Sequence, residues 1–193
     1  MARRREIVTL PAAVLHERAR EVTPAQLASP AVQELIDDMI ETMRAASGAG
    51  LAANQVGELL RIAVIEVAGH NTRYPYKPPI ALTVIVNPVI EPLDDERFAI
   101  NEGCLSVPDT RGVVARHVNV RVRYLDRFGV EHEEVRRGLT AGTFQHELDH
   151  LDGVLFVDRV GDTATLTTWE EFERDHRAAF EQRARELVAR VGS

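Results

Sequence analysis

The stretch that most constrains this chain is His146-Glu147-Leu148-Asp149-His150, followed shortly by Gly153. In an α-helix, residues four positions apart lie on one face, so His146 and His150 can bind one metal ion together. Glu147 can then act as a base beside that ion. Two histidines are too few, because a catalytic metal site usually has three protein ligands. The rest of the fold must therefore supply a third.

Three positions are candidates for that third ligand. A further histidine after the motif, as in one class of zinc proteases, is excluded because Phe156 occupies the position. Glu170 lies about twenty residues beyond His150, the spacing of another zinc protease class, so a zinc peptidase with His146, His150 and Glu170 as ligands is one hypothesis. Cys104 offers a thiolate, which soft metals favour. A third hypothesis is a structural metal with four protein ligands and no catalysis.

Two further helices are predicted. Ser29 is a suitable N-cap and Pro30 suits the first turn. The apolar residues that follow share one helical face: Val32, Leu35, Ile36, Met39, Ile40 and Met43. At the other end, residues 169 to about 190 read as a helix with a capping box of Thr168 and Glu171.

Strands are predicted between these helices. The β-rich runs are 61–67, 82–90, 113–125 and 130–136. Residues 127–129 should turn the last two runs into a hairpin over 113–136. The connection 68–80, with three prolines, is a local insertion of unknown use. We expect one domain over 1–193 with an α+β fold, in which mostly antiparallel sheets pack around the central metal-binding helix, with one helix N-terminal and one C-terminal.

Composition narrows the functional classes. The 193 residues are 45% hydrophobic and 27% charged, as in ordinary globular proteins, and no apolar run has membrane-spanning length. A net charge of −7 argues against general affinity for nucleic acid. The single cysteine, Cys104, excludes an internal disulfide and fits a reducing compartment. We expect a cytoplasmic protein without a membrane or nucleic-acid partner.

Three separate segments resemble the peptide deformylases. They are Gly48-x-Gly50-Leu51-Ala52-Ala53-x-Gln55, Glu102-Gly103-Cys104-Leu105-Ser106 and Gln145-His146-Glu147-x-Asp149-His150, in the order and approximate spacing of that family. The resemblance extends from about Leu10 to about Val160. It implies that Cys104, His146 and His150 hold one divalent metal ion, most often Fe²⁺, with Zn²⁺, Ni²⁺ or Co²⁺ as possible replacements. It also implies a hydrolase that removes the N-formyl group from the formyl-methionine of nascent polypeptides and releases formate.

The resemblance assigns the catalytic roles as well. Metal-activated water attacks the formyl carbon, and Glu147 serves as general base and then acid. The Gln55 side chain and the Leu105 backbone N–H donate to the developing oxyanion. Glu102 pairs with Arg116 in a buried ion pair that fixes the ligand-bearing segment.

The resemblance also assigns a substrate pocket. Its residues are Ala49, Gly50, Ile100, Arg111, Leu139 and Gly142. Arg111 matches a position that contacts the peptide, with an exposed surface role as the alternative. Many family members have larger aliphatic residues at the positions of Ala49 and Gly142, so we expect a roomier or reshaped pocket with a weaker preference for methionine. Some relatives dock on the ribosome through the C-terminal helix, but residues 169–193 carry six acidic and five basic side chains, so a basic docking surface is not evident.

Overall fold

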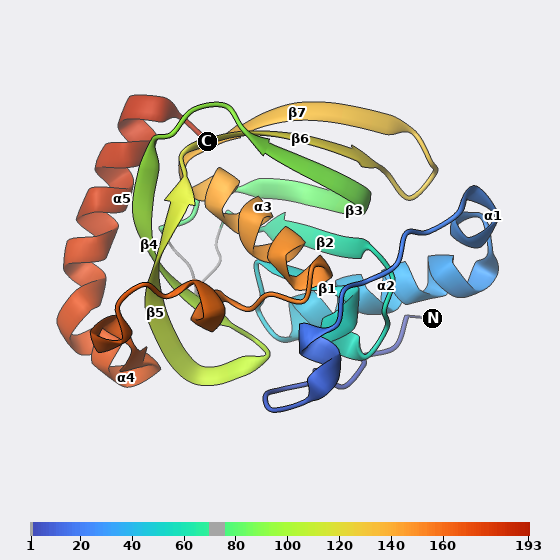
Figure 1. Cartoon of the computed structure of the whole chain (residues 1–193), viewed down its shortest axis with the longest axis horizontal. Coiled ribbons are helices and arrows are strands. Elements are labelled where there is room, and N and C mark those ends of the chain that lie inside the picture. The colour runs from blue at the N-terminus through green and yellow to red at the C-terminus, as the bar shows by residue number, and fades with distance from the viewer. Residues whose placement is uncertain (1, 70–75) are drawn as a thin grey trace.

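Two antiparallel sheets enclose one central helix, α3 (Gly138–Leu151) (Figure 1). The computed structural model describes residues 2–69 and 76–193. Helix α5 (Arg177–Val191) lies at one end of the molecule, and α1 (Pro24–Leu27) and α2 (Pro30–Ala45) lie at the other. The predicted α+β fold, with mostly antiparallel sheets, an N-terminal helix and a C-terminal helix, is confirmed.

The larger sheet has five strands. In spatial order they are β1 (Gly50–Ala52), β2 (Ile62–Val67), β3 (Ile80–Pro92), β6 (Asn119–Leu125) and β7 (Glu131–Arg137). Helix α2 packs its apolar face on this sheet, and all six residues of the predicted stripe are buried. The side chain of Ser29 accepts a hydrogen bond from the Val32 backbone N–H, so the predicted cap is present. The predicted strands 61–67 and 82–90 correspond to β2 and the longer β3.

The smaller sheet overturns one predicted strand. It consists of β4 (Arg97–Cys104), β5 (Val107–His117) and the short β8 (Thr167–Thr168). The predicted strand 113–125 is wrong, because the chain leaves this sheet at Val118 and enters the other one as β6. Side chains alternate between buried and exposed on both sides of Val118. The sequence pattern therefore does not show that the chain passes from one sheet to the other there. The hairpin is β6–β7, which begins at Asn119 rather than at residue 113, and its turn includes the predicted residues 127–129.

Helix α3 is buried along most of its length because sheet strands and the C-terminal helix cover it. It ends at Leu151, close to the predicted stop at Gly153. Gly153 has φ +73°, and a Cβ there would lie 2.5 Å from the His16 carbonyl oxygen. Glycine is therefore required at this turn, which presses the N-terminal segment against the end of the helix.

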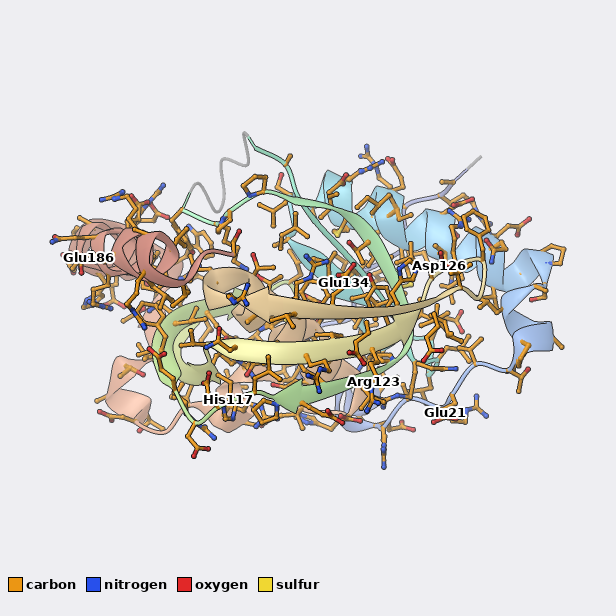
Figure 2. All side chains as sticks on the ribbon, turned by 90° about the horizontal axis from the view of Figure 1, so that it is seen from above. Glu21, His117, Arg123, Asp126, Glu134 and Glu186 are labelled. Carbon is orange, nitrogen blue, oxygen red and sulfur yellow. The ribbon has the colours of Figure 1, made fainter. Side chains whose placement is uncertain are left out.

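The C-terminal segment is helical from Trp169 to Val191, with a π-helical stretch over Phe172–His176 between α4 (Trp169–Glu171) and α5. The capping box of Thr168 and Glu171 is present. Helix α5 buries Phe180, Ala184 and Leu187 against the body. Its opposite face carries charged side chains such as Glu186, which points outward (Figure 2). Among the helices of the described residues, none is long and apolar enough to cross a membrane.

Candidate metal centre and active site

Cys104, His146 and His150 come together at the centre of the molecule. Their ligand atoms all lie within 4.8 Å of one another, and Cys104 Sγ lies 3.2 Å from His150 Nε2. The two histidines lie one turn apart on α3, and the cysteine comes from the end of β4. Burial alone would raise the pKa of the Cys104 thiol, but the two histidines outweigh it and hold that pKa well below its ordinary value. One thiolate and two imidazoles are a donor set that suits Zn²⁺ or Fe²⁺.

A buried ion-pair chain orients His146. The Glu102 carboxylate lies 2.8 Å from His146 Nδ1, which leaves Nε2 of the ring directed at the metal centre. Arg116 donates two hydrogen bonds, of 2.7 and 2.9 Å, to the same carboxylate and a third, of 2.5 Å, to Asp149. Burial alone would raise the pKa of Glu102, but Arg116 and His146 lower it far below its usual range. Arg116 and His146 therefore favour the ionised form of the carboxylate.

The Gln55 amide is held with its nitrogen toward Cys104. Gln55 Oε1 accepts a hydrogen bond of 2.8 Å from the Ala52 backbone N–H, so Nε2 faces the site. Gln55 Nε2 lies 3.4 Å from Cys104 Sγ and 3.1 Å from Ser106 Oγ. The amide donor is thus fixed beside the candidate metal ligands by the local fold of residues 50–56.

The N-terminal segment ties these loops together. The Val8 backbone N–H donates to the Gln55 carbonyl oxygen, and the Leu10 N–H donates to the Ser106 carbonyl oxygen, at 2.8 and 2.9 Å. Asn54 adds a hydrogen bond of 2.6 Å to the His150 carbonyl oxygen. The glutamine loop, the cysteine loop and the helix therefore keep a fixed geometry although they lie far apart in sequence.

Glu147 faces the pocket beside the metal centre. Its side chain is buried, and within the described part of the chain Oε2 has no hydrogen-bond partner. Burial raises the pKa of Glu147 above its ordinary value, although His146 and His150 oppose the shift. A Cβ at Gly50 would lie 2.4 Å from Glu147 Cδ and Oε1. Only glycine at position 50 leaves the room that this carboxylate occupies.

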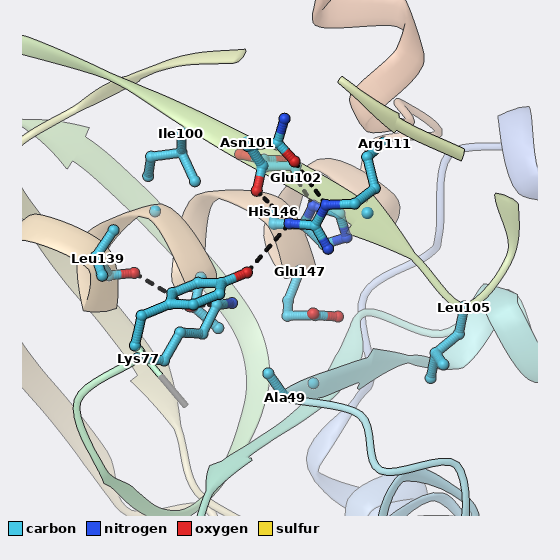
Figure 3. Close-up of a pocket in the computed structure, with 15 residues that line it drawn as sticks. Ala49, Lys77, Ile100, Asn101, Glu102, Leu105, Arg111, Leu139, His146 and Glu147 are labelled. Atoms are coloured by element: carbon cyan, nitrogen blue, oxygen red, sulfur yellow. Dashed lines mark hydrogen bonds and ion pairs between the residues drawn. The ribbon is translucent and has the colours of Figure 1, made fainter. Parts of the chain in front are cut away.

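The predicted pocket residues surround this carboxylate. In Figure 3 Glu147 points into the pocket, and Leu105 and Leu139 lie on opposite sides of it. The lining also includes the other predicted substrate-binding residues: Ala49, Gly50, Ile100, Arg111 and Gly142. The room expected at Gly142 is not open, however. Ile100 Cδ1 lies 2.3 Å from where a Cβ of residue 142 would be, so a neighbouring side chain fills that space.

Arg111 is not on the surface. It is fully buried, and its guanidinium lies over the rings of Trp169 and Phe172, at 4.4 and 4.0 Å from their centroids. It also donates hydrogen bonds to the Asn101 side chain and backbone at 2.6 and 2.7 Å. The alternative of an exposed surface role is therefore wrong. The sequence around Arg111 does not indicate this burial, because the rings that cover its side chain lie about sixty residues further along the chain.

Sequence reasoning missed several pocket residues. Asn101 orients Arg111, Thr143 extends the pocket along α3, and Tyr76 and Lys77 enter it from the connection 68–80. Residues 70–75 of that connection, with Pro75, lie outside the described residues. The signal that could have drawn attention to Lys77 is composition, since it is the only lysine in the sequence.

The other metal hypotheses lose support from this arrangement. Glu170 is exposed in the first turn of α4, and the cluster of donors close enough to share an ion, within residues 2–69 and 76–193, is Cys104, His146 and His150. Three donors next to a pocket with a buried carboxylate match a catalytic metal site rather than a closed four-ligand structural one.

Comparisons with known proteins agree with the geometry. A family model described as polypeptide deformylase matches residues 4–165. A peptide deformylase of Leptospira biflexa is 42% identical over 159 residues, covering 82% of this chain and 89% of its own, and one of Bartonella tribocorum is 47% identical over 156 residues, covering 81% and 84%. The crystal structure of the class I type b peptide deformylase from Acinetobacter baumannii with bound Met-Ala-Ser has a TM-score of 0.79 at 38% identity, covering 83% of this chain and all of that one. The chain therefore belongs to the polypeptide deformylase family and is an enzyme of that family.

Proposed function

We propose that this enzyme hydrolyses the N-formyl group from the formyl-methionyl end of nascent polypeptides and releases formate and a free amine. The observation that carries the proposal is the buried Glu147 carboxylate beside the Cys104, His146 and His150 donor cluster, at the wall of a pocket. The Acinetobacter baumannii enzyme, similar in fold and sequence, was solved with Met-Ala-Ser, the peptide that deformylation of formyl-Met-Ala-Ser would leave.

Cys104, His146 and His150 would hold one divalent ion. Fe²⁺ is the expected ion in the cell, with Zn²⁺, Ni²⁺ or Co²⁺ as possible replacements. When bound, such an ion polarises the formyl carbonyl and acidifies water. Glu102 and Arg116 supply the support that fixes the His146 ring for this task.

Glu147 moves the proton. Burial favours its neutral form, so the carboxylate is a stronger base than an exposed glutamate. It takes a proton from the attacking water and delivers it to the departing amine nitrogen, which needs one to leave. Among the described residues, the carboxylates that line the pocket are Glu147 and Glu102, and Glu102 is committed to Arg116 and His146.

Gln55 and Leu105 stabilise the developing negative charge on the formyl oxygen. The Gln55 amide nitrogen already faces the metal ligands, and Leu105 lies beside it in the cysteine loop and lines the pocket. Donors that are in place before the reaction need no reorganisation. Removing one such donor typically costs about 2.7–4 kcal/mol of barrier.

The pocket formed by Ala49, Gly50, Ile100, Leu139 and Gly142 would receive the first side chain of the peptide. Because Ile100 fills the space at Gly142, we expect a reshaped pocket with weaker selection for methionine. Comparing kcat/KM for formyl-Met, formyl-Leu and formyl-Phe peptides checks this. A strong methionine preference would contradict it.

The experiment that tests the function is formate release from formyl-Met-Ala-Ser by protein purified without oxygen. Anaerobic handling protects both the Cys104 thiolate and Fe²⁺. The matched control is Glu147→Gln, which keeps the shape of the side chain and should bind metal but release no formate. Metal-loaded wild-type protein that releases no formate would refute the proposal.

The proposal also covers the cellular location of the reaction and its partners. We place it in the cytoplasm, where nascent chains emerge, without membrane or specific nucleic-acid partners. Transient ribosome contact through residues 169–193 stays a prediction, and co-sedimentation with ribosomes tests it.

A further inference from the structure

The single lysine of the chain lies inside the substrate pocket. Lys77 belongs to the connection before β3, and its Nζ donates a hydrogen bond of 2.9 Å to Thr143 Oγ1. The sequence has 23 lysines and arginines in total, and the other 22 are arginines. Lys77 lines the same pocket as Glu147 and His146, and Figure 3 shows it on the Leu139 side.

The position of the amine relative to the reaction centre follows from helix geometry. Leu139, Thr143 and Glu147 are spaced four residues apart on α3, so they follow one another along one face. Each step of four residues is slightly more than one turn, about 6 Å along the axis. The Lys77 amine at Thr143 therefore lies about one turn from Glu147. Both residues line the same pocket, so a side chain bound beside Glu147 can approach the amine.

Burial and the nearby carboxylates act in opposite directions on the pKa of the Lys77 amine. Burial lowers the pKa of Lys77 to about 8, and Arg111 and Arg116 act in the same direction, while Glu102 and Glu147 oppose them. An ammonium has three N–H donors and no acceptor. A substrate side chain with an oxygen acceptor can take a hydrogen bond from this amine, whereas an aliphatic one of the same length cannot.

We propose that Lys77 is a specificity-determining residue that favours N-formyl peptides whose first side chain ends in an oxygen acceptor. This inference rests on the proposed deformylase function and names its substrate class. Methionine sulfoxide is the nearest such side chain to methionine, since it keeps the chain length and adds one strong acceptor. Norleucine has the same length and offers no acceptor.

The test compares formate release from three peptides, formyl-Met-Ala-Ser and its methionine sulfoxide and norleucine analogues, by the anaerobic metal-loaded enzyme. For wild type we expect the ratio of kcat/KM for sulfoxide over norleucine to exceed one by about tenfold, the range of a hydrogen bond to a charged group. Lys77→Met should bring this ratio close to one, and Lys77→Arg should retain part of it. Arg183→Met is the matched control, because it removes a positive charge on the exposed face of α5.

The ratio separates a specificity role from an indirect one. If Lys77 acted only through the charge of Glu147 or through folding, Lys77→Met would change kcat/KM for all three peptides by the same factor and leave the ratio unaltered. That result would overturn the inference but not the deformylase function. No formate from any peptide would overturn both.

A binding measurement gives a readout without turnover. Because the sequence has one lysine, labelling the lysine Nζ with ¹⁵N gives a single side-chain amine signal. In zinc-loaded protein, the product with methionine sulfoxide should shift this signal more than the norleucine product. Equal shifts, or none, would overturn the inference.

Discussion

The contact between Gly50 and Glu147 makes a sharp prediction for Gly50→Ala. A Cβ at position 50 would lie 2.4 Å from Glu147 Cδ and Oε1 and 2.6 Å from Cγ, so its three nearest atoms all belong to that side chain. Residue 50 cannot withdraw easily, because it is paired with Ile65 in the larger sheet. The carboxylate must therefore move.

The size of the displacement sets the expected loss. Ordinary contacts of this kind are 3.4–4 Å, so the Glu147 carboxylate has to retreat by about 1 Å. A misplacement of about 1 Å at a catalytic group can reduce the rate by about 100-fold. The extra methyl group should also cost about 1–3 kcal/mol of stability, as overpacking does in other cores. Metal retention should persist, because Cys104, His146 and His150 are not among the atoms displaced.

Formate release, bound metal per chain and urea unfolding measure these three quantities separately. Gly161→Ala is the matched control, since a Cβ there meets nothing within 4 Å and the residue has no positive φ. Wild-type kcat/KM in Gly50→Ala would refute the assignment of Glu147 as the group that moves the proton. Loss of metal together with activity would show that the substitution damages the centre itself.

Three more predictions follow from the same geometry. Cys104→Ser should abolish metal retention after dialysis, measured by elemental analysis, whereas Glu170→Gln should retain it; the reverse pattern would restore the zinc peptidase hypothesis. Arg116→Met should lower the free energy of unfolding in urea by about 3–5 kcal/mol, because it leaves Glu102 buried without its cation; a loss below about 1 kcal/mol would contradict this. Burial lowers the pKa of Lys77 to about 8 in the folded protein, so below pH 8 its charge opposes folding, and this penalty fades as pH rises toward the unfolded value. Lys77→Met should therefore be more stable than wild type at pH 7 and lose that advantage by about pH 10.5 in urea titrations, and a constant difference would argue against a buried amine.

The local sequence pattern was sufficient to predict the helices and caps that depend on residues close together in sequence. The apolar stripe of α2, its Ser29 cap and the capping box of Thr168 and Glu171 were all predicted, because each depends on residues within a few turns. The helical placement of His146 and His150 follows from their spacing for the same reason.

The sequence pattern gave wrong predictions where a residue's position depends on contacts with distant parts of the chain. Residues 113–125 alternate as one strand, yet β5 and β6 belong to different sheets. Arg111 was predicted to contact substrate, with an exposed surface role as the alternative, and the structure buries it fully beneath Trp169 and Phe172. In both cases the deciding contact lies far away along the chain, and periodicity carries no information about it.

By itself, the sequence placed His146, Glu147 and His150 on one predicted helix, and its resemblance to the peptide deformylases made Cys104 and Gln55 their expected partners. Only the tertiary structure decided that Ile100 takes the space beside Gly142 and that Lys77 reaches Thr143. The physical reason is that ligand residues are constrained by their own chemistry, which spacing and residue type display. The shape and polarity of the pocket depend instead on which distant side chains pack against α3, and those contacts exist only after folding.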